Sequence, residues 1–216
     1  MADLIPDPLR AARLILQLRR QGITNDAVLS ALETVDRGAF VDAKLAELAN
    51  EDCSVPIACG QTIPRPLVTA QLLSALSISP GKEERILLVG SGSGYTAALL
   101  AHSARHVYGI ERYKKLVGQS RERLSRLGVE NVTIRHGDGL QGLSEHGPFD
   151  RILLCGAVTT IPRELLEQLS KDGILVTPLN ESDTQVLRIL NAERHVSDQP
   201  IANPLSALVA GKADHF

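Results

Sequence analysis

Three glycines at alternate positions, in the stretch GSGSG at residues 90–94, are the part of the sequence best suited to bind a ligand. They follow a short apolar run, and residues 96–102 have a helical pattern. Glycine has no Cβ, so a loop of this kind lets the backbone approach a ligand at the carboxyl edge of a sheet. Because three alternate glycines exceed what a tight turn requires, we expect the loop to bind a nucleotide-like molecule.

Two acidic residues follow later apolar runs and belong to the same predicted edge. Glu111 lies at about the distance past the glycines at which an acid accepts hydrogen bonds from ribose hydroxyls. Asp138 follows the next run, where its carboxylate could accept from an adenine amino group. The glycine spacing alone leaves NAD open, because residues 92–97 also satisfy the dinucleotide pattern G-x-G-x-x-A. Carboxylates repel phosphate, however, so the two acids favour S-adenosylmethionine.

These residues must be positioned by the apolar runs that alternate with amphipathic stretches from residue 85 onward. The runs begin at residues 85, 106, 131, 150 and 173. Strands at such intervals cannot pair as simple hairpins, so they predict βαβ units and a parallel sheet covered on both faces. We therefore expect an α/β fold with a doubly wound, mostly parallel, Rossmann-like sheet. Residues 185–189 and 205–210 could add edge strands, which could be antiparallel.

An N-terminal helical extension is predicted before this sheet. Residues 8–20 are amphipathic and end near Gly22, and a second helix follows a cap at Thr24 or Asn25. Residues 50–66 have the proline and glycine content of a loop, whereas residues 67–77 are helical.

In domain terms, we expect residues 1–80 to form helices and a loop that pack on an α/β core of residues 81–216. At 216 residues the chain is long enough for this to be one compact domain with a single large core.

Composition restricts the partners of the protein. The formal charge is −2 and the pI is near 6.3, which gives no global basic field for nucleic acid or an anionic membrane. The apolar runs are far shorter than the roughly 20 residues of a membrane helix, and the first residues do not resemble a signal peptide. The 3 cysteines lack C-x-x-C spacing, which argues against a disulfide framework and a zinc site. We expect a cytoplasmic protein without a metal.

Taken together, the segments of the chain resemble the protein-L-isoaspartate O-methyltransferase family from about residue 10 to residue 190. The stretch Gly-Gln-Thr-Ile at residues 60–63 is particular to that family, whereas the glycine loop is shared by many methyltransferases. Other matching positions, in the family's order and spacing, are Gln21, Gly22, Ile23, Val35, Arg37, Asp52, Pro66, Tyr95, Gly137, Phe149, Asp150 and Pro178.

The resemblance implies a repair reaction, in which S-adenosylmethionine methylates the carboxylate of L-isoaspartyl residues in damaged peptides and proteins. The methyl ester then leads back through a succinimide. A carboxylate with a pKa of about 4 is ionised at pH 7, so the enzyme mainly has to align it with the methyl group and exclude water. An obvious catalytic histidine is therefore not required.

Site residues are carried over from the family by position. The resemblance implies that Thr62 lies on the catalytic side, that Glu111 binds the ribose, and that Asp138 with Gly139 binds the adenine. Residues 90–92 would pass beneath the methionine part. The full set of implied cofactor contacts is Gln61, Thr62, Ile63, Thr69, Gly90, Ser91, Gly92, Gly94, Glu111, Arg112, Asp138, Gly139 and Gln185.

Two positions depart from the family pattern. The serine that follows Gly-Gln-Thr-Ile is replaced by Pro64, and the acid two residues before the first glycine is replaced by Leu88. Loss of the hydroxyl removes a hydrogen bond of about 1.5–3 kcal/mol if its partner is charged. Two alternatives therefore stay open: a methyltransferase of the same fold with another acceptor, and a catalytically impaired homologue that binds the cofactor.

Overall fold

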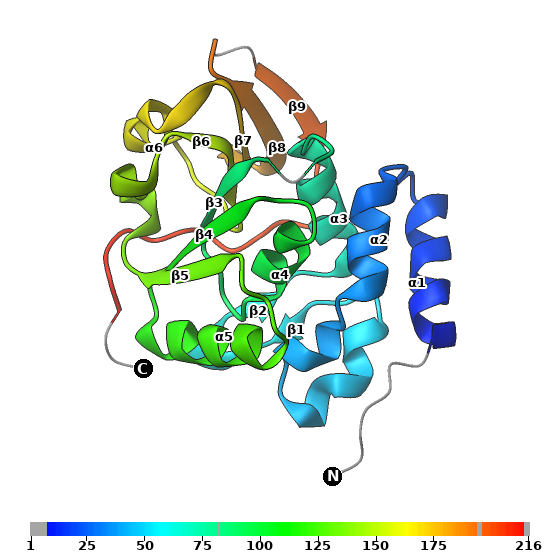
Figure 1. Ribbon diagram of the computed structural model, residues 1–216. Helices are drawn as coiled ribbons and strands as arrows, with labels where there is room; N and C mark the ends of the chain where they lie inside the picture. Colours follow the sequence, from blue (N-terminus) through cyan, green and yellow to red (C-terminus); the bar gives the residue numbers. More distant parts are fainter. Residues whose placement is uncertain (1–7, 82, 194–195, 214–216) are drawn as a thin grey trace.

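In the computed structural model, which describes residues 8–81, 83–193 and 196–213, helices precede a sheet (Figure 1). Helix α1 (Pro8–Arg20) is followed by Gly22 at φ +93°, and α2 (Asp26–Thr34) begins after Asn25. The Asn25 side chain accepts a hydrogen bond from the Val28 N–H, as a helix cap should. Helix α3 (Pro66–Ala75) has a proline at its start. The predicted N-terminal helices are thus confirmed.

The segment between α2 and α3 is made of short elements. It contains the 3₁₀ helices η1 (Arg37–Phe40), η2 (Ala43–Asn50) and η3 (Ala58–Gly60). Within the predicted loop, β1 (Val55–Pro56) pairs antiparallel with β2 (Thr62–Ile63). This small hairpin sets the position of the Gly-Gln-Thr-Ile stretch.

A seven-stranded sheet follows, in the order β5-β4-β3-β6-β7-β8-β9. Its strands are β3 (Arg85–Val89), β4 (His106–Glu111), β5 (Val132–His136), β6 (Phe149–Leu154), β7 (Leu169–Glu181), β8 (Thr184–Asn191) and β9 (Val196–Pro200). The first five strands pair in parallel, whereas β8 and β9 are antiparallel. The expected mostly parallel α/β sheet is confirmed. Residues 185–189 lie in an antiparallel strand, as expected, but this strand, β8, is between β7 and β9 and not at the edge of the sheet.

The prediction of an edge strand at residues 205–210 is wrong. In the described chain the last strand is β9, and residues 205–210 are irregular apart from an isolated bridge between Ala157 and Ala207. Their short run of mostly apolar residues resembles a strand. Their backbone groups, however, bond to the loop after β6 and to side chains.

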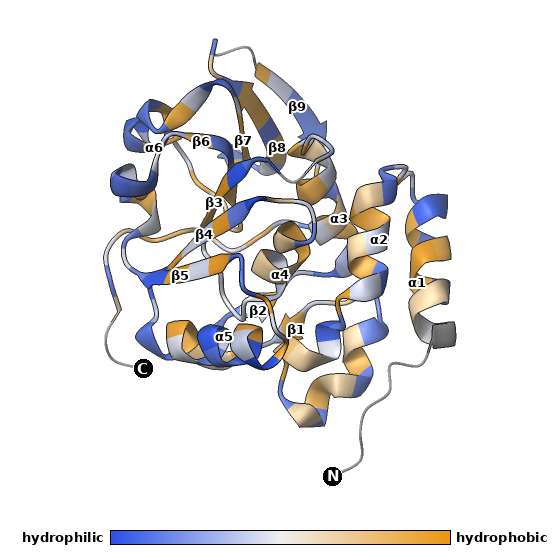
Figure 2. Cartoon of the chain, viewed as in Figure 1, coloured by the Kyte–Doolittle hydropathy of each residue, from blue (hydrophilic) through white to orange (hydrophobic). Residues whose placement is uncertain are grey.

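Helices α4 (Tyr95–Ala101), α5 (Lys114–Arg126) and α6 (Arg163–Glu167) connect or flank the parallel strands. Along α5 hydrophobic and hydrophilic residues alternate in Figure 2, as expected for a helix with one buried face. Of the described residues, no helix is both long and apolar enough to cross a membrane. The first residues, which the sequence predicts not to be a signal peptide, lie outside the described part.

The largest hydrophobic cluster contains residues of the N-terminal helices together with residues of the sheet. Leu18 of α1, Leu72 of α3 and Leu88 of β3 are each 0–1% exposed in this cluster. The rings of Phe40 and Tyr95 pack against each other within this cluster, with their centroids 5.5 Å apart. Leu88, at the position where the resemblance implies an acid, therefore packs in the hydrophobic core.

Candidate functional site

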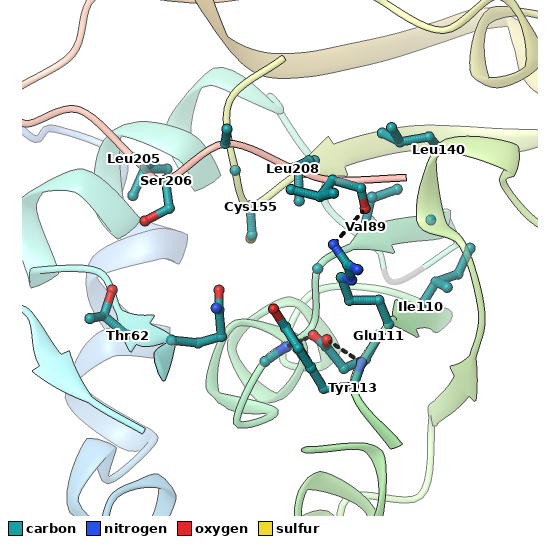
Figure 3. Close-up of a pocket in the computed structure, with 18 of the residues that line it drawn as sticks. Thr62, Val89, Ile110, Glu111, Tyr113, Leu140, Cys155, Leu205, Ser206 and Leu208 are labelled. Carbon is teal, nitrogen blue, oxygen red and sulfur yellow. Dashed lines mark hydrogen bonds between the residues drawn. The ribbon is translucent and has the colours of Figure 1, made fainter. Parts of the chain in front are cut away.

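A pocket opens at the carboxyl edge of the sheet, beside β3 (Figure 3). The strand order reverses at β3, because β4 and β5 lie on one side and β6 and β7 on the other. Open α/β sheets bind ligands at such a reversal, outside the carboxyl ends of the strands. The cavity volume is about 170 Å³, and the pocket is open to solvent.

The glycine loop forms one side of the pocket. Gly90 and Gly92 both have positive φ angles, +79° and +54°, which favour glycine. The N–H groups of Gly90 and Ser91 donate to the Ile110 carbonyl at 2.9 and 3.1 Å, so the loop is tied to the end of β4. A Cβ built on Gly90 would lie 3.3 Å from Leu208 Cδ2, which leaves little room for a side chain.

Glu111 is fixed beneath this loop by backbone donors. Its side chain is buried, and the two carboxylate oxygens accept from the Gly92 N–H at 2.8 Å and the Tyr113 N–H at 2.9 Å (Figure 3). An ionised carboxylate has about four acceptor positions, so these bonds leave capacity for ribose hydroxyls. Glu111 is thus oriented by backbone N–H groups of the protein itself.

Two predicted residues near Glu111 bond to the C-terminal part of the chain. The Arg112 guanidinium donates to the Val209 carbonyl at 3.2 Å and lies over the Tyr113 ring. The Asp138 carboxylate accepts from the Leu140 N–H at 3.0 Å and from the Gly211 N–H at 2.7 Å. Sequence reasoning assigned Asp138 to adenine, and in this structure its oxygens bond to backbone N–H groups.

Gln61 and Thr62 of the Gly-Gln-Thr-Ile stretch form the opposite side of the pocket together with Pro64. Behind them lies Arg37, which is buried and donates to the backbone carbonyls of residues 49, 51, 53, 63 and 64 at 2.8–3.4 Å. Burial lowers the pKa of Arg37 from its ordinary value. One guanidinium thereby connects η2, the segment before β1, and β2, and it bonds directly to the Pro64 carbonyl.

The pocket collects part of the predicted set. The predicted residues that line it are Gln61, Thr62, Gly90, Gly92, Glu111, Arg112 and Gly139. Those that lie outside its lining are Ile63, Thr69, Ser91, Gly94, Asp138 and Gln185. Pro64 lines the pocket, whereas Leu88 does not. The cofactor contacts themselves stay a prediction for every residue of the set.

Several lining residues were not anticipated. Cys155 comes directly after β6 and Tyr113 comes two residues after β4, so the rule that ligands bind at the carboxyl ends of strands would have found both. Burial raises the pKa of Cys155 to about 12, so its thiol stays protonated and is a poor nucleophile. Residues 205–209 also line the pocket, and they carry no local motif that would have indicated it.

Sequence comparison places the chain among known proteins. The family model of Protein-L-isoaspartate(D-aspartate) O-methyltransferase (PCMT) matches residues 9–203. A protein-L-isoaspartate O-methyltransferase of Pectobacterium atrosepticum is 42% identical over 189 residues, which cover 88% of each chain. The protein of the same name from Yersinia enterocolitica is 45% identical over 172 residues, 80% of this chain and 82% of the relative.

Solved structures agree with this match. A Plasmodium falciparum structure described as a beta-aspartate methyltransferase (PCMT), in complex with S-adenosyl-L-homocysteine, has a TM-score of 0.77 and 28% identity. The match covers 91% of this chain and 97% of that one. A further protein-L-isoaspartate O-methyltransferase structure, with a TM-score of 0.81 and 23% identity over 91% of this chain and 65% of that one, shares the fold. From residue 9 to residue 203, therefore, the chain belongs to the protein-L-isoaspartate O-methyltransferase family.

Proposed function

We propose that this protein transfers a methyl group from S-adenosyl-L-methionine to the carboxylate of L-isoaspartyl residues in damaged peptides and proteins. The observation that carries the proposal is the identity of 42–45% to relatives named for this reaction, over most of both chains. The pocket beside β3, where the strand order reverses, supports the proposal, because the glycine loop, the buried Glu111 and Thr62 all line it.

The bound cofactor would supply an electrophilic methyl group on a sulfonium. The ionised substrate carboxylate attacks the methyl carbon, and the C–S bond breaks with its electron pair going to sulfur. The products are a methyl ester and S-adenosyl-L-homocysteine, and no proton has to move. The chain's own residues therefore act by alignment and by exclusion of water.

Each side of the pocket has a role in this proposal. Glu111 accepts from the ribose hydroxyls, residues 90–92 pass beneath the methionine part, and Gly139 with Asp138 lies at the adenine. Asp138 can accept from adenine through its remaining lone pairs, or by release of the Gly211 N–H. Thr62, whose side chain is exposed at the pocket edge, faces the reacting centre as a hydrogen-bond donor.

A methyl-transfer assay tests the proposal. The purified protein is incubated with methyl-labelled S-adenosyl-L-methionine and either an isoaspartyl peptide or the same peptide with a normal aspartyl residue. We expect base-labile label on the isoaspartyl peptide only, as a methyl ester would give. Equal label on the two peptides would contradict the proposed acceptor.

A second candidate, a methyltransferase with another acceptor, is favoured by one observation. Pro64 lines the pocket where the family has a serine, and proline brings neither a hydroxyl nor a backbone N–H. Pro64→Ser restores the hydroxyl, and Pro64→Ala is the matched control that removes the ring without adding it. If isoaspartyl peptides are the natural acceptor, kcat/KM rises at most about a hundredfold in Pro64→Ser, the worth of one hydrogen bond to a charged group. Isoaspartyl activity in Pro64→Ser alone would favour the second candidate.

We also propose that the protein is cytoplasmic and that residues 1–80 pack on residues 81–216 as one compact domain. The half-buried cysteines Cys53, Cys59 and Cys155 are free thiols, which suits a reducing compartment. The hydrophobic cluster shared by the N-terminal helices and the sheet supports a single folding unit. Cell fractionation tests the location, and one coincident unfolding transition by different probes tests the single unit.

A further inference from the structure

Residues 205–209, which we call the C-terminal strap, lie across the pocket from Glu111 and Tyr113 (Figure 3). The Ser206 carbonyl accepts from the Ala157 N–H at 2.9 Å, and the Leu208 N–H donates to the Ala157 carbonyl at 2.8 Å. The strap therefore reaches the pocket without belonging to a strand, and its backbone is held by a few separate contacts.

Gln185 on β8 holds the first residue of the strap. Its Oε1 accepts from the Leu205 N–H at 2.7 Å, and its Nε2 donates to the Leu205 carbonyl at 3.1 Å. Nε2 also donates to Asn180 Oδ1 at 2.9 Å, across the β7–β8 hairpin. The side-chain amide thus binds both backbone groups of one strap residue, as a neighbouring strand would, and is itself fixed by the sheet.

The position of the strap along its own axis matters because of Leu208. A Cβ built on Gly156 would lie 2.8 Å from the Leu208 side chain, and one on Gly90 would lie 3.3 Å from it. Leu208 thus fills space that two glycines leave open beside the glycine loop. A shift of the strap by one residue would replace Leu208 with alanine or valine there and would move one wall of the pocket.

We infer that Gln185 is a positioning residue for methyl transfer, which sets the C-terminal strap against the cofactor pocket through Leu205. It acts without lining the pocket, so its role differs from the direct cofactor contact expected for it from the sequence. The inference rests on the function proposed above. It concerns how the site is held and not which acceptor is used.

Gln71 on α3 offers a matched control. Its Oε1 accepts from the Ala202 N–H at 2.9 Å, and its Nε2 donates to the Pro200 carbonyl at 3.3 Å. Gln71 therefore binds the chain just before the strap, with the same chemistry, and it does not line the pocket. Gln185→Leu and Gln71→Leu each remove a glutamine amide and keep a similar side-chain volume.

The two variants are compared with the wild-type protein by three measurements. The first is hydrogen exchange of the peptide that covers the strap, measured without ligand. The second is the affinity for S-adenosyl-L-homocysteine, measured by calorimetry. The third is kcat and KM with an isoaspartyl peptide. We expect faster exchange over the strap and about a tenfold loss of affinity and of kcat/KM in Gln185→Leu, as for a few neutral hydrogen bonds. Gln71→Leu should match the wild type in all three. Thermal unfolding serves as a control for stability, and it should show similar shifts in Tm for both variants.

The inference is overturned if exchange over the strap is unchanged in Gln185→Leu, or if both variants lose affinity and activity equally. Where Gln185→Leu fails to fold, Gln185→Glu takes its place, since it keeps the acceptor for the Leu205 N–H and loses the Nε2 donor. A wild-type protein that binds S-adenosyl-L-homocysteine but does not methylate the isoaspartyl peptide would refute the proposed acceptor. Hydrogen exchange over the strap and the affinity for S-adenosyl-L-homocysteine would still decide the role of Gln185.

Discussion

The two walls of the pocket are held in different ways. The glycine-loop wall, residues 89–92 and 110–113, continues two adjacent parallel strands, and its hydrogen bonds join backbone groups to Glu111 at its centre. The loop–strap wall, residues 61–64 and 205–209, contains little regular structure and is held by Arg37 and Gln185. The sheet therefore fixes the first wall, whereas a few polar side chains fix the second, so single substitutions can move the second wall while the sheet stays intact.

Glu111→Ala breaks the glycine-loop wall at its charged group and has the largest expected effect. It removes the acceptor proposed for the ribose and leaves the Gly92 and Tyr113 N–H groups without their carboxylate. Hydrogen bonds to a charged group contribute about 1.5–3 kcal/mol each, so we expect affinity for S-adenosyl-L-homocysteine to fall at least about a hundredfold. Calorimetry measures this. Glu122→Ala, at an exposed acid of α5, is the control that should bind normally, and normal binding by Glu111→Ala would remove it from the site.

Arg37→Met breaks the loop–strap wall at its buried cation. The substitution leaves several loop carbonyls unpaired, including those of Cys53 and Pro64, so we expect a loss of about 2–4 kcal/mol in the free energy of unfolding. Urea unfolding measures the loss. Arg37→Lys keeps the charge but not the forked donors, so it should recover only part of it. Wild-type stability in Arg37→Met would show that the wall does not depend on this residue.

Gly90→Ala sharpens the comparison at the point where the two walls meet, and its expected effect is the smallest. The methyl group would sit at φ +79°, close to Leu208 of the strap, so we expect a loss of about 1–2 kcal/mol in unfolding free energy. Gly118→Ala in α5, with no neighbouring atom in its way, should instead stabilise the protein by about 0.5–1 kcal/mol. Thermal unfolding compares them, and equal shifts in the same direction would contradict the close contact between the walls.

The glycine-loop wall could be predicted from the sequence because its pattern is local. An apolar run, a glycine loop and an acid at the end of the next strand determine where Gly90 and Glu111 lie, once parallel strands are assumed. The same rule places Tyr113 and Cys155, which were overlooked.

The loop–strap wall could not be predicted, because its contacts join residues far apart in the sequence. Nothing local distinguishes residues 205–210 from an edge strand. Their partners are the loop at Ala157 and the side chains of Gln185 and Arg112. Asp138 shows the same limit, since its carboxylate bonds to the Gly211 N–H, 73 residues further along the chain. For Arg37, the family pattern indicated the residue but not its carbonyl partners.

The structure of the protein with S-adenosyl-L-homocysteine bound tests the two-wall site most directly. We expect a carboxylate oxygen of Glu111 within about 2.5–3.2 Å of a ribose hydroxyl, and the sulfur turned toward Thr62 and Pro64. The strap should lie against the ligand, with Leu205 still bound to Gln185. A ribose held away from Glu111, or a ligand bound outside the space between the two walls, would contradict the site.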